Sequence, residues 1–168
     1  KISLGDFFGL RALALLKERS FSVFIFCSFM LCIPLSFYFQ SANGFLKEMG
    51  IANSEGVMTL GQISEILFLF LVPWFFRKLG VKKMLMIGMS FWVIRYLLFS
   101  QSNPGTEVFL FLGVLVHGIC YDFFFVTGQL YVDRVAPREI RSSAQGFIAF
   151  VTLGVGMFVG GILNGWWN

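Results

Sequence analysis

Long apolar stretches alternate with short polar segments along the whole chain. A membrane-spanning helix needs about 20 mostly apolar residues in succession. Five stretches meet this requirement, at residues 21–40, 57–76, 81–100, 107–131 and 143–163. The short connections between them favour adjacent antiparallel helices. The pattern therefore predicts an all-α, polytopic membrane protein with five transmembrane helices, in a bundle that covers residues 20–168.

The segment before the first apolar stretch has a different pattern. Leu10, Leu13 and Leu16 recur at roughly helical spacing, and basic residues lie among them. A basic amphipathic helix of this kind lies in the plane of the membrane interface. Residues 1–19 are therefore predicted to form a cytoplasmic linker with an amphipathic helix that leads into the bundle.

Composition agrees with a membrane location. Hydrophobic residues make up 57% of the chain and charged residues 13%, whereas soluble domains contain about 25% charged residues. The formal net charge of +4 would suggest nucleic acid in a soluble protein, but here the basic residues gather at the ends of apolar stretches. We therefore expect the lipid bilayer, and no nucleic acid, as a partner. The sequence has no phosphate loop, nucleophile–base pattern or metal-ligand cluster, so we expect no enzyme, no catalytic residue, no cofactor and no metal.

The basic residues also predict the orientation of the helices. Three segments that alternate along the chain hold 11 of the 13 Lys and Arg residues. These are Lys1, Arg11, Lys17, Arg19, Arg77, Lys78, Lys82, Lys83, Arg134, Arg138 and Arg141. Because cytoplasmic loops carry an excess of Lys and Arg, the N-terminus and both basic loops are expected in the cytoplasm. The chain begins with Lys1 and has no signal-peptide pattern, so it is interpreted as a piece of a longer protein.

An acidic residue lies deep in the second apolar stretch. Glu65 follows Gln62 by three residues, so the two side chains share one face of a helix. A carboxylate at the bilayer centre costs about 2.5–3.5 kcal/mol on insertion scales, and such residues are functional-site candidates by default. Glu65 is therefore interpreted as a residue for substrate hydrogen bonding, proton carriage or both. The alternative is a structural salt bridge.

The fourth apolar stretch carries His117, the only histidine, and Tyr121 four residues later. The spacing places both on one helix face. An imidazole can donate or accept a hydrogen bond and can titrate near neutral pH, and Tyr121 adds a stacking surface and a hydroxyl. We therefore expect these two residues in a binding site, with His117 as a second candidate for the proton carrier. The alternative for a single histidine is a structural role.

Two further charges, Arg95 and Asp122, lie within the apolar stretches. Buried charges are normally paired. Counting helical rise from the cytoplasmic ends places the two at similar depths, about 5 Å apart. The sequence favours an Arg95–Asp122 pair, which leaves Glu65 free. A pair between Arg95 and Glu65 is the alternative, and it would make Glu65 mainly structural.

Several motifs resemble the nucleoside:proton symporter family of the major facilitator superfamily. The resemblance rests on GQISEILFLFLVPWFFRKLGVKKMLMIGMSFWVIRYLLF from Gly61, SNPG from Ser102, HGICYDFFFVTGQLYVD from His117 and IRSSAQGF from Ile140. It covers nearly the whole chain, which corresponds to the C-terminal half of such a transporter from helix seven to helix eleven. The sixth helix of that half would then be missing.

The resemblance implies roles for particular residues. The Gln and Glu of the QISE segment contact the nucleoside in that family, and two aromatic positions of helix ten line the same site. In helix seven the family has a Gln and an Asn, and other residues stand there in this chain. The implied substrate-binding residues are Gln62, Glu65, His117, Tyr121, Ser36 and Phe39.

These observations lead to one expected function and two alternatives. The expected function is proton-coupled import of nucleosides by alternating access, with the N-terminal half of the same transporter as partner and the bacterial inner membrane as location. Glu65 and His117 are the two candidates for proton coupling. The alternatives are a carrier of the same fold for a sugar or another small polar metabolite, and a membrane receptor or scaffold without transport.

Overall fold

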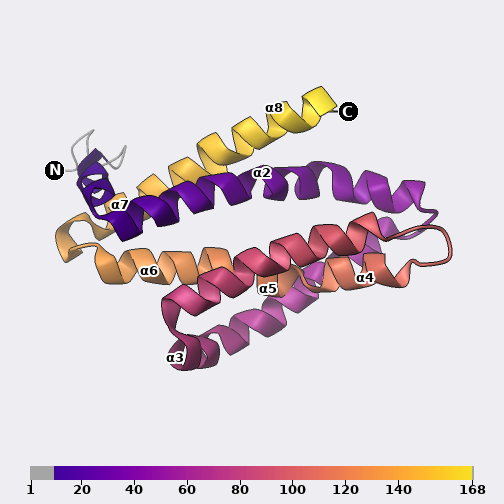
Figure 1. Ribbon diagram of the computed structural model, residues 1–168, viewed down its shortest axis with the longest axis horizontal. Coiled ribbons are helices and arrows are strands. Elements are labelled where there is room, and N and C mark those ends of the chain that lie inside the picture. The colour runs from indigo at the N-terminus through magenta and orange to yellow at the C-terminus, as the bar shows by residue number, and fades with distance from the viewer. Residues whose placement is uncertain (1–9, 168) are drawn as a thin grey trace. The chain divides into compact units, whose positions relative to one another are not determined.

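The computed structural model describes residues 10–167, and within this range the chain forms helices joined by turns (Figure 1). A 3₁₀ helix, η1, precedes the first long helix. Three 3₁₀ or π-helical segments then interrupt the later helices. In chain order the elements are η1 (Leu10–Lys17), α2 (Arg19–Glu48), α3 (Ser54–Ser100), α4 (Val108–Leu115), α5 (His117–Tyr121), η2 (Asp122–Val126), α6 (Thr127–Val135), η3 (Arg138–Ile140), α7 (Arg141–Ala149), η4 (Phe150–Gly156) and α8 (Met157–Trp167).

Within residues 10–167, four helical segments are long and apolar enough to cross a membrane. They are Arg19–Glu48, Ser54–Ser100, Val108–Val135 and Arg138–Trp167. The second contains two of the five predicted spans, because it is interrupted at Gly80, whose backbone has φ 71° and ψ 170°. This conformation favours glycine, and α3 folds back on itself there (Figure 1). Each of the five predicted spans therefore lies in a helix, and the all-α membrane fold is confirmed.

Two of the long helical segments contain π-helical turns. In the third, Val116 separates α4 from α5, and η2 follows directly as a π-helical turn. In the fourth, η4 is a π-helical turn between α7 and α8. A π-helical turn holds an extra residue, so it changes the direction of the side chains, and such turns are frequent at functional sites.

The helices form two compact units. Unit 2 is Ser41–Gly128, and unit 1 combines the described residues up to Gln40 with those from Gln129 onward. In unit 2 both arms of α3 pack against the segment that contains α5 and η2. Its apolar core includes Val72, Met84 and Phe123.

Small residues bring α2 and α8 together in unit 1. A Cβ on Gly156 would lie 2.6 Å from the Cβ of Cys32, and a Cβ on Gly160 would lie 2.6 Å from that of Ser36. Small residues allow close approach of membrane helices. Gly156 and Gly160 of the last predicted span therefore serve helix packing.

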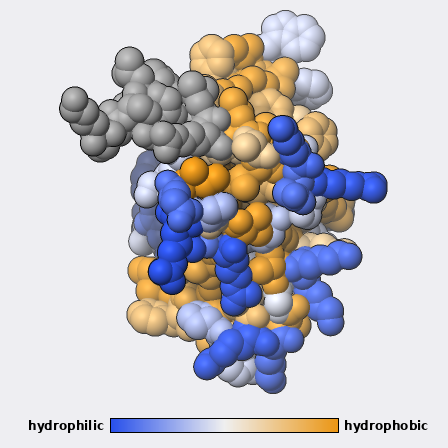
Figure 2. Space-filling model, turned by 90° about the vertical axis from the view of Figure 1, so that its left-hand side faces the viewer, coloured by the Kyte–Doolittle hydropathy of each residue, from blue (hydrophilic) through white to orange (hydrophobic). Residues whose placement is uncertain are grey.

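Hydrophilic side chains project from an otherwise apolar surface on the face drawn in Figure 2. The polar connections seen in the sequence supply exposed basic residues: Arg77, Lys78, Lys82 and Lys83 at the turn of α3, and Arg134 and Arg138 near η3. Of the predicted amphipathic segment 1–19, residues 1–9 lie outside the described range, and Leu10–Lys17 is helical. Its location at the cytoplasmic membrane interface stays a prediction.

Candidate functional site

Three of the predicted polar residues meet inside unit 2. Glu65 lies on the first arm of α3, Arg95 on the second arm, and His117 at the start of α5. The Nε2 atom of His117 lies 3.4 Å from Oε2 of Glu65. The Nδ1 atom of the same ring lies 2.9 Å from Nη1 of Arg95. The histidine therefore contacts a cation on one side and a carboxylate on the other.

A break in the helix positions His117 beside Glu65. The Ser64 hydroxyl donates a hydrogen bond to the carbonyl of Leu115 and accepts one from the backbone N–H of Gly118, at 3.3 Å. These backbone groups flank the break at Val116, so one side chain satisfies both. Ser64 is adjacent to Glu65 in the sequence, and Gly118 is adjacent to His117. The hydrogen bonds of Ser64 therefore fix the distance between Glu65 and His117.

Glycine is required at the same crossing. A Cβ on Gly118 would lie 2.5 Å from the carbonyl oxygen of Ser64, and a Cβ on Gly61 would lie 3.3 Å from the carbonyl oxygen of Val114. Ser64 and Gly118 are not among the site residues predicted from the sequence. Their signal is their position, since each is adjacent to a candidate polar residue within an apolar stretch.

Burial decreases across the cluster from Arg95 to Glu65. Arg95 is fully buried and His117 is 4% exposed, whereas the Glu65 side chain is 34% exposed. The guanidinium carbon of Arg95 lies 5.3 Å from the ring centre of Trp92 and 5.6 Å from that of Phe99, distances at which cation–π attraction acts. The basic end of the cluster is thus enclosed, and the carboxylate is its most exposed end.

Tyr121 continues the site along the helix. Its ring centre lies 5.6 Å from that of His117 and 5.1 Å from that of Phe125. The three rings form a row of aromatic surfaces, and the His117 end of the row contacts the carboxylate. Such a row can stack against a planar ring.

The remaining candidate residues differ in their surroundings. Gln62 is exposed on α3 one turn before Glu65. Ser36 and Phe39 belong to unit 1, where Phe39 is exposed and Ser36 is fully buried. The Ser36 hydroxyl donates to the carbonyl of Met157 at 3.3 Å.

The predicted Arg95–Asp122 pair is not formed. Arg95 contacts His117, as described above, and neither carboxylate oxygen of the fully buried Asp122 has a hydrogen-bond partner among the described residues. Depth along a straight helix does not determine which way a side chain is rotated about the helix axis. The break at Val116 and the π-helical turn at Asp122 change both direction and rotation, and they bring the histidine to the arginine.

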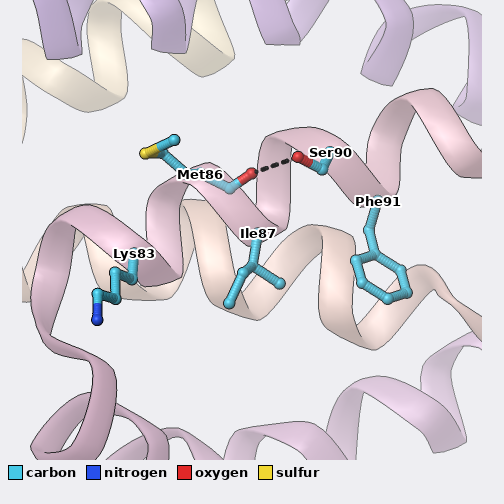
Figure 3. Close-up of a pocket in the computed structure, with 5 residues that line it drawn as sticks. All are labelled: Lys83, Met86, Ile87, Ser90 and Phe91. Carbon is cyan, nitrogen blue, oxygen red and sulfur yellow. Dashed lines mark hydrogen bonds between the residues drawn. The ribbon is translucent and has the colours of Figure 1, made fainter.

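A groove of about 360 Å³ lies elsewhere on unit 2 (Figure 3). Lys83, Met86, Ile87, Ser90 and Phe91, all on the second arm of α3, line it, and the Ser90 hydroxyl donates to the Met86 carbonyl at 2.9 Å. Other residues of the second arm of α3 pack against the neighbouring helical segment. One is Gly88, where a Cβ would lie 2.8 Å from the backbone nitrogen of Phe124. The groove therefore lies apart from the candidate site.

The fold and the site together are typical of one class of protein. Apolar helices enclose an arginine, a histidine and a glutamate in contact, with aromatic rings beside them. Intramembrane clusters of this type are typical of transporters and pumps. The chain is thus an integral membrane protein with the features of a transporter.

Comparison with known proteins identifies the family. Residues 1–167 match the family described as "Nucleoside H+ symporter". The chain is 45% identical to the putative nucleoside transporter YegT of Escherichia coli K12, over 98% of this chain and 40% of the relative. It is 33% identical to the nucleoside permease NupG of the same organism, over 94% of this chain and 40% of the relative. The chain belongs to the nucleoside H+ symporter family.

A solved structure agrees with this assignment. A crystal structure of a mutant of the nucleoside transporter NupG superposes with a TM-score of 0.88 at 31% identity, covering 96% of this chain and 43% of that one. The chain therefore spans about 40% of the length of the relatives it matches.

Proposed function

We propose that this chain is the C-terminal part of a proton-coupled symporter that imports nucleosides by alternating access. Family membership supports the class of transport. The observation that carries the proposal is the contact of His117 with both Glu65 and Arg95 inside apolar helices. An ionisable cluster at that position is costly in a membrane, and a coupled transporter has a use for it.

The chemistry of the cluster fits a nucleoside. The Glu65 carboxylate and the Gln62 amide can hydrogen-bond ribose hydroxyls, and the Tyr121 ring can stack against a base. Glu65 also combines an ionisable group with partial exposure, as a group that takes up and releases a proton requires. Gln62, Glu65, His117 and Tyr121 are thus the proposed substrate-binding residues of unit 2, and Ser36 and Phe39 those of unit 1.

The partners and location follow from the same proposal. The proposed partner of this chain is the N-terminal half of the same transporter, and the substrate and the proton would bind to the complete protein. The lipid bilayer is the surrounding phase, and the bacterial inner membrane is the proposed location. The distribution of Lys and Arg residues supports a cytoplasmic location for the N-terminus of this chain. The chain would then carry no catalytic activity.

Uptake by the full-length protein tests the proposal. Cells or proteoliposomes that contain it should accumulate labelled uridine when a proton gradient is imposed, and a protonophore should abolish the accumulation. An excess of unlabelled galactose should not compete. Competition by the sugar would favour the carrier for another polar metabolite. Binding of uridine without any uptake would favour a receptor.

A further inference from the structure

We infer that Arg95 is a positioning residue that holds His117 as the neutral tautomer with its hydrogen on Nε2, so that the ring donates to Glu65 and leaves proton carriage to that carboxylate. The part about proton carriage rests on the proposed function. The part about the tautomer rests on the geometry of unit 2 alone.

The Nδ1 nitrogen of His117 faces Arg95. A guanidinium group has five N–H donors and no acceptor. Nη1 of Arg95 lies 2.9 Å from Nδ1 of His117, a normal distance for a hydrogen bond between two nitrogens. Since the arginine can only donate, Nδ1 must supply the lone pair. The single hydrogen of the neutral ring is then on Nε2.

The Nε2 nitrogen of His117 is close to Glu65. Nε2 of His117 lies 3.4 Å from Oε2 of Glu65. An N–H at Nε2 has this carboxylate as its neighbour, so the tautomer that Arg95 selects is also the one that suits Glu65. In a histidine, the hydrogen bond made by one ring nitrogen determines whether the other nitrogen carries a hydrogen.

Arg95 also opposes protonation of the His117 ring. A second hydrogen on Nδ1 would face the N–H of Arg95 across 2.9 Å, and two positive charges would then be adjacent in apolar surroundings. Arg95 is fully buried and lies against Trp92 and Phe99, so the guanidinium cannot simply turn to water. Protonation of His117 therefore requires its contact with Arg95 to break.

The carboxylate has the opposite surroundings. Glu65 is the most exposed member of the cluster, and the N–H of His117 faces it. Arg95 contacts Nδ1 of the same ring, and the buried carboxylate of Asp122 lies further along the chain, at the start of η2. A proton that enters from the aqueous side binds an oxygen of Glu65, and that oxygen no longer needs the histidine N–H. The uptake of a proton thus changes the Glu65–His117 contact and leaves the Arg95–His117 contact intact.

Nitrogen NMR of histidine in the full-length transporter tests the tautomer. The protein is labelled with ¹⁵N-histidine, and the signals of His117 are those lost in His117→Gln. The wild type should show one protonated and one unprotonated nitrogen, assigned to Nε2 and Nδ1. Arg95→Met should give a mixture of tautomers. Lys83→Met is the matched control, because it removes an exposed charge from the same arm of α3, and it should leave the spectrum unchanged.

Each outcome decides one part of the inference. A hydrogen on Nδ1, or a doubly protonated ring at neutral pH, in the wild type would overturn the tautomer assignment whether or not Arg95→Met folds. An unchanged single tautomer in a folded Arg95→Met would remove the role of Arg95.

Transport measurements separate the second part. His117→Gln keeps an amide donor, so we expect weaker uridine affinity but continued accumulation that depends on the proton gradient. Loss of that dependence would assign the proton to the histidine. A wild type that takes up no nucleoside would reject the proposed function and leave the NMR result standing.

Discussion

The polar groups inside the apolar helices differ between the two units. In unit 1 a chain of neutral groups joins α2 to α8. The Gln40 amide donates to the Ser36 hydroxyl at 2.7 Å, and the Asn164 amide donates to the Gln40 carbonyl oxygen at 3.3 Å. In unit 2 the corresponding cluster is ionisable, with Glu65, His117 and Arg95 in contact.

The two clusters have different energetic costs. Hydrogen bonds between neutral side chains of membrane helices contribute on average about 0.6 kcal/mol, so the unit 1 cluster is a modest aid to packing. Charged groups at the helix centre each cost about 2.5–3.5 kcal/mol on insertion scales. Stability therefore does not explain the unit 2 cluster. We expect the two clusters to respond differently to substitution.

The largest effect is expected from Glu65→Gln in the full-length transporter. An imposed gradient of one pH unit is worth about 1.4 kcal/mol, which supports about tenfold accumulation with one proton per substrate. The amide keeps hydrogen bonds but has no group to protonate. This accumulation should therefore disappear while exchange of labelled for unlabelled uridine continues. Uptake with and without a protonophore measures the first quantity, and counterflow measures the second.

Glu55→Gln provides the matched control. Glu55 is also in unit 2, but its carboxylate is exposed and lies 2.7 Å from the ammonium of Lys47. Exposed ion pairs contribute about 0–1 kcal/mol, so accumulation should persist. Unchanged accumulation in Glu65→Gln would show that the proton binds elsewhere, and the contrast between the units would lose its functional meaning.

The contrast between the units could be predicted from the sequence only in part. The spans follow from apolar length, which a bilayer fixes, and the candidate residues Glu65, His117 and Arg95 stand out as ionisable groups in such spans. Their contacts could not be predicted, because the pairing depends on helix rotation. The interruption at Val116 and the π-helical turn at Asp122 have no strong local signal, and they decide that Arg95 meets His117.

The next effect concerns the helix crossing that positions the unit 2 cluster. Gly118→Ala places a Cβ 2.5 Å from the Ser64 carbonyl oxygen, and overpacking of this kind costs about 1–3 kcal/mol. We expect a lower unfolding midpoint in detergent and reduced uptake per folded molecule. Gly165→Ala, in unit 1, meets nothing within 4 Å and should leave both unchanged. Equal stability of the two variants would mean that the crossing relaxes freely.

An effect of similar size is expected from Ser64→Ala. The substitution removes the donor to the Leu115 carbonyl and the acceptor for the Gly118 N–H. A buried backbone group that loses its partner costs about 1–3 kcal/mol. Ser28→Ala in unit 1 is the control, because that hydroxyl donates to the Phe24 carbonyl of its own helix. If both variants lose the same uridine uptake per folded molecule, Ser64 has no special role in positioning His117.

The smallest effect is expected in the neutral cluster of unit 1. The hydrogen bond between Asn164 and Gln40 should give a coupling free energy of about 0.6 kcal/mol, the average for such pairs in a membrane protein. A double-mutant cycle with Gln40→Ala and Asn164→Ala, read from the free energy of unfolding in detergent, measures this quantity. Because the cluster holds helices together and carries no charge, the dependence of uptake on the proton gradient should survive in all three variants. A change in that dependence would mean that Gln40 or Asn164 takes part in proton coupling, beyond the substrate contact proposed for Ser36 in the same cluster.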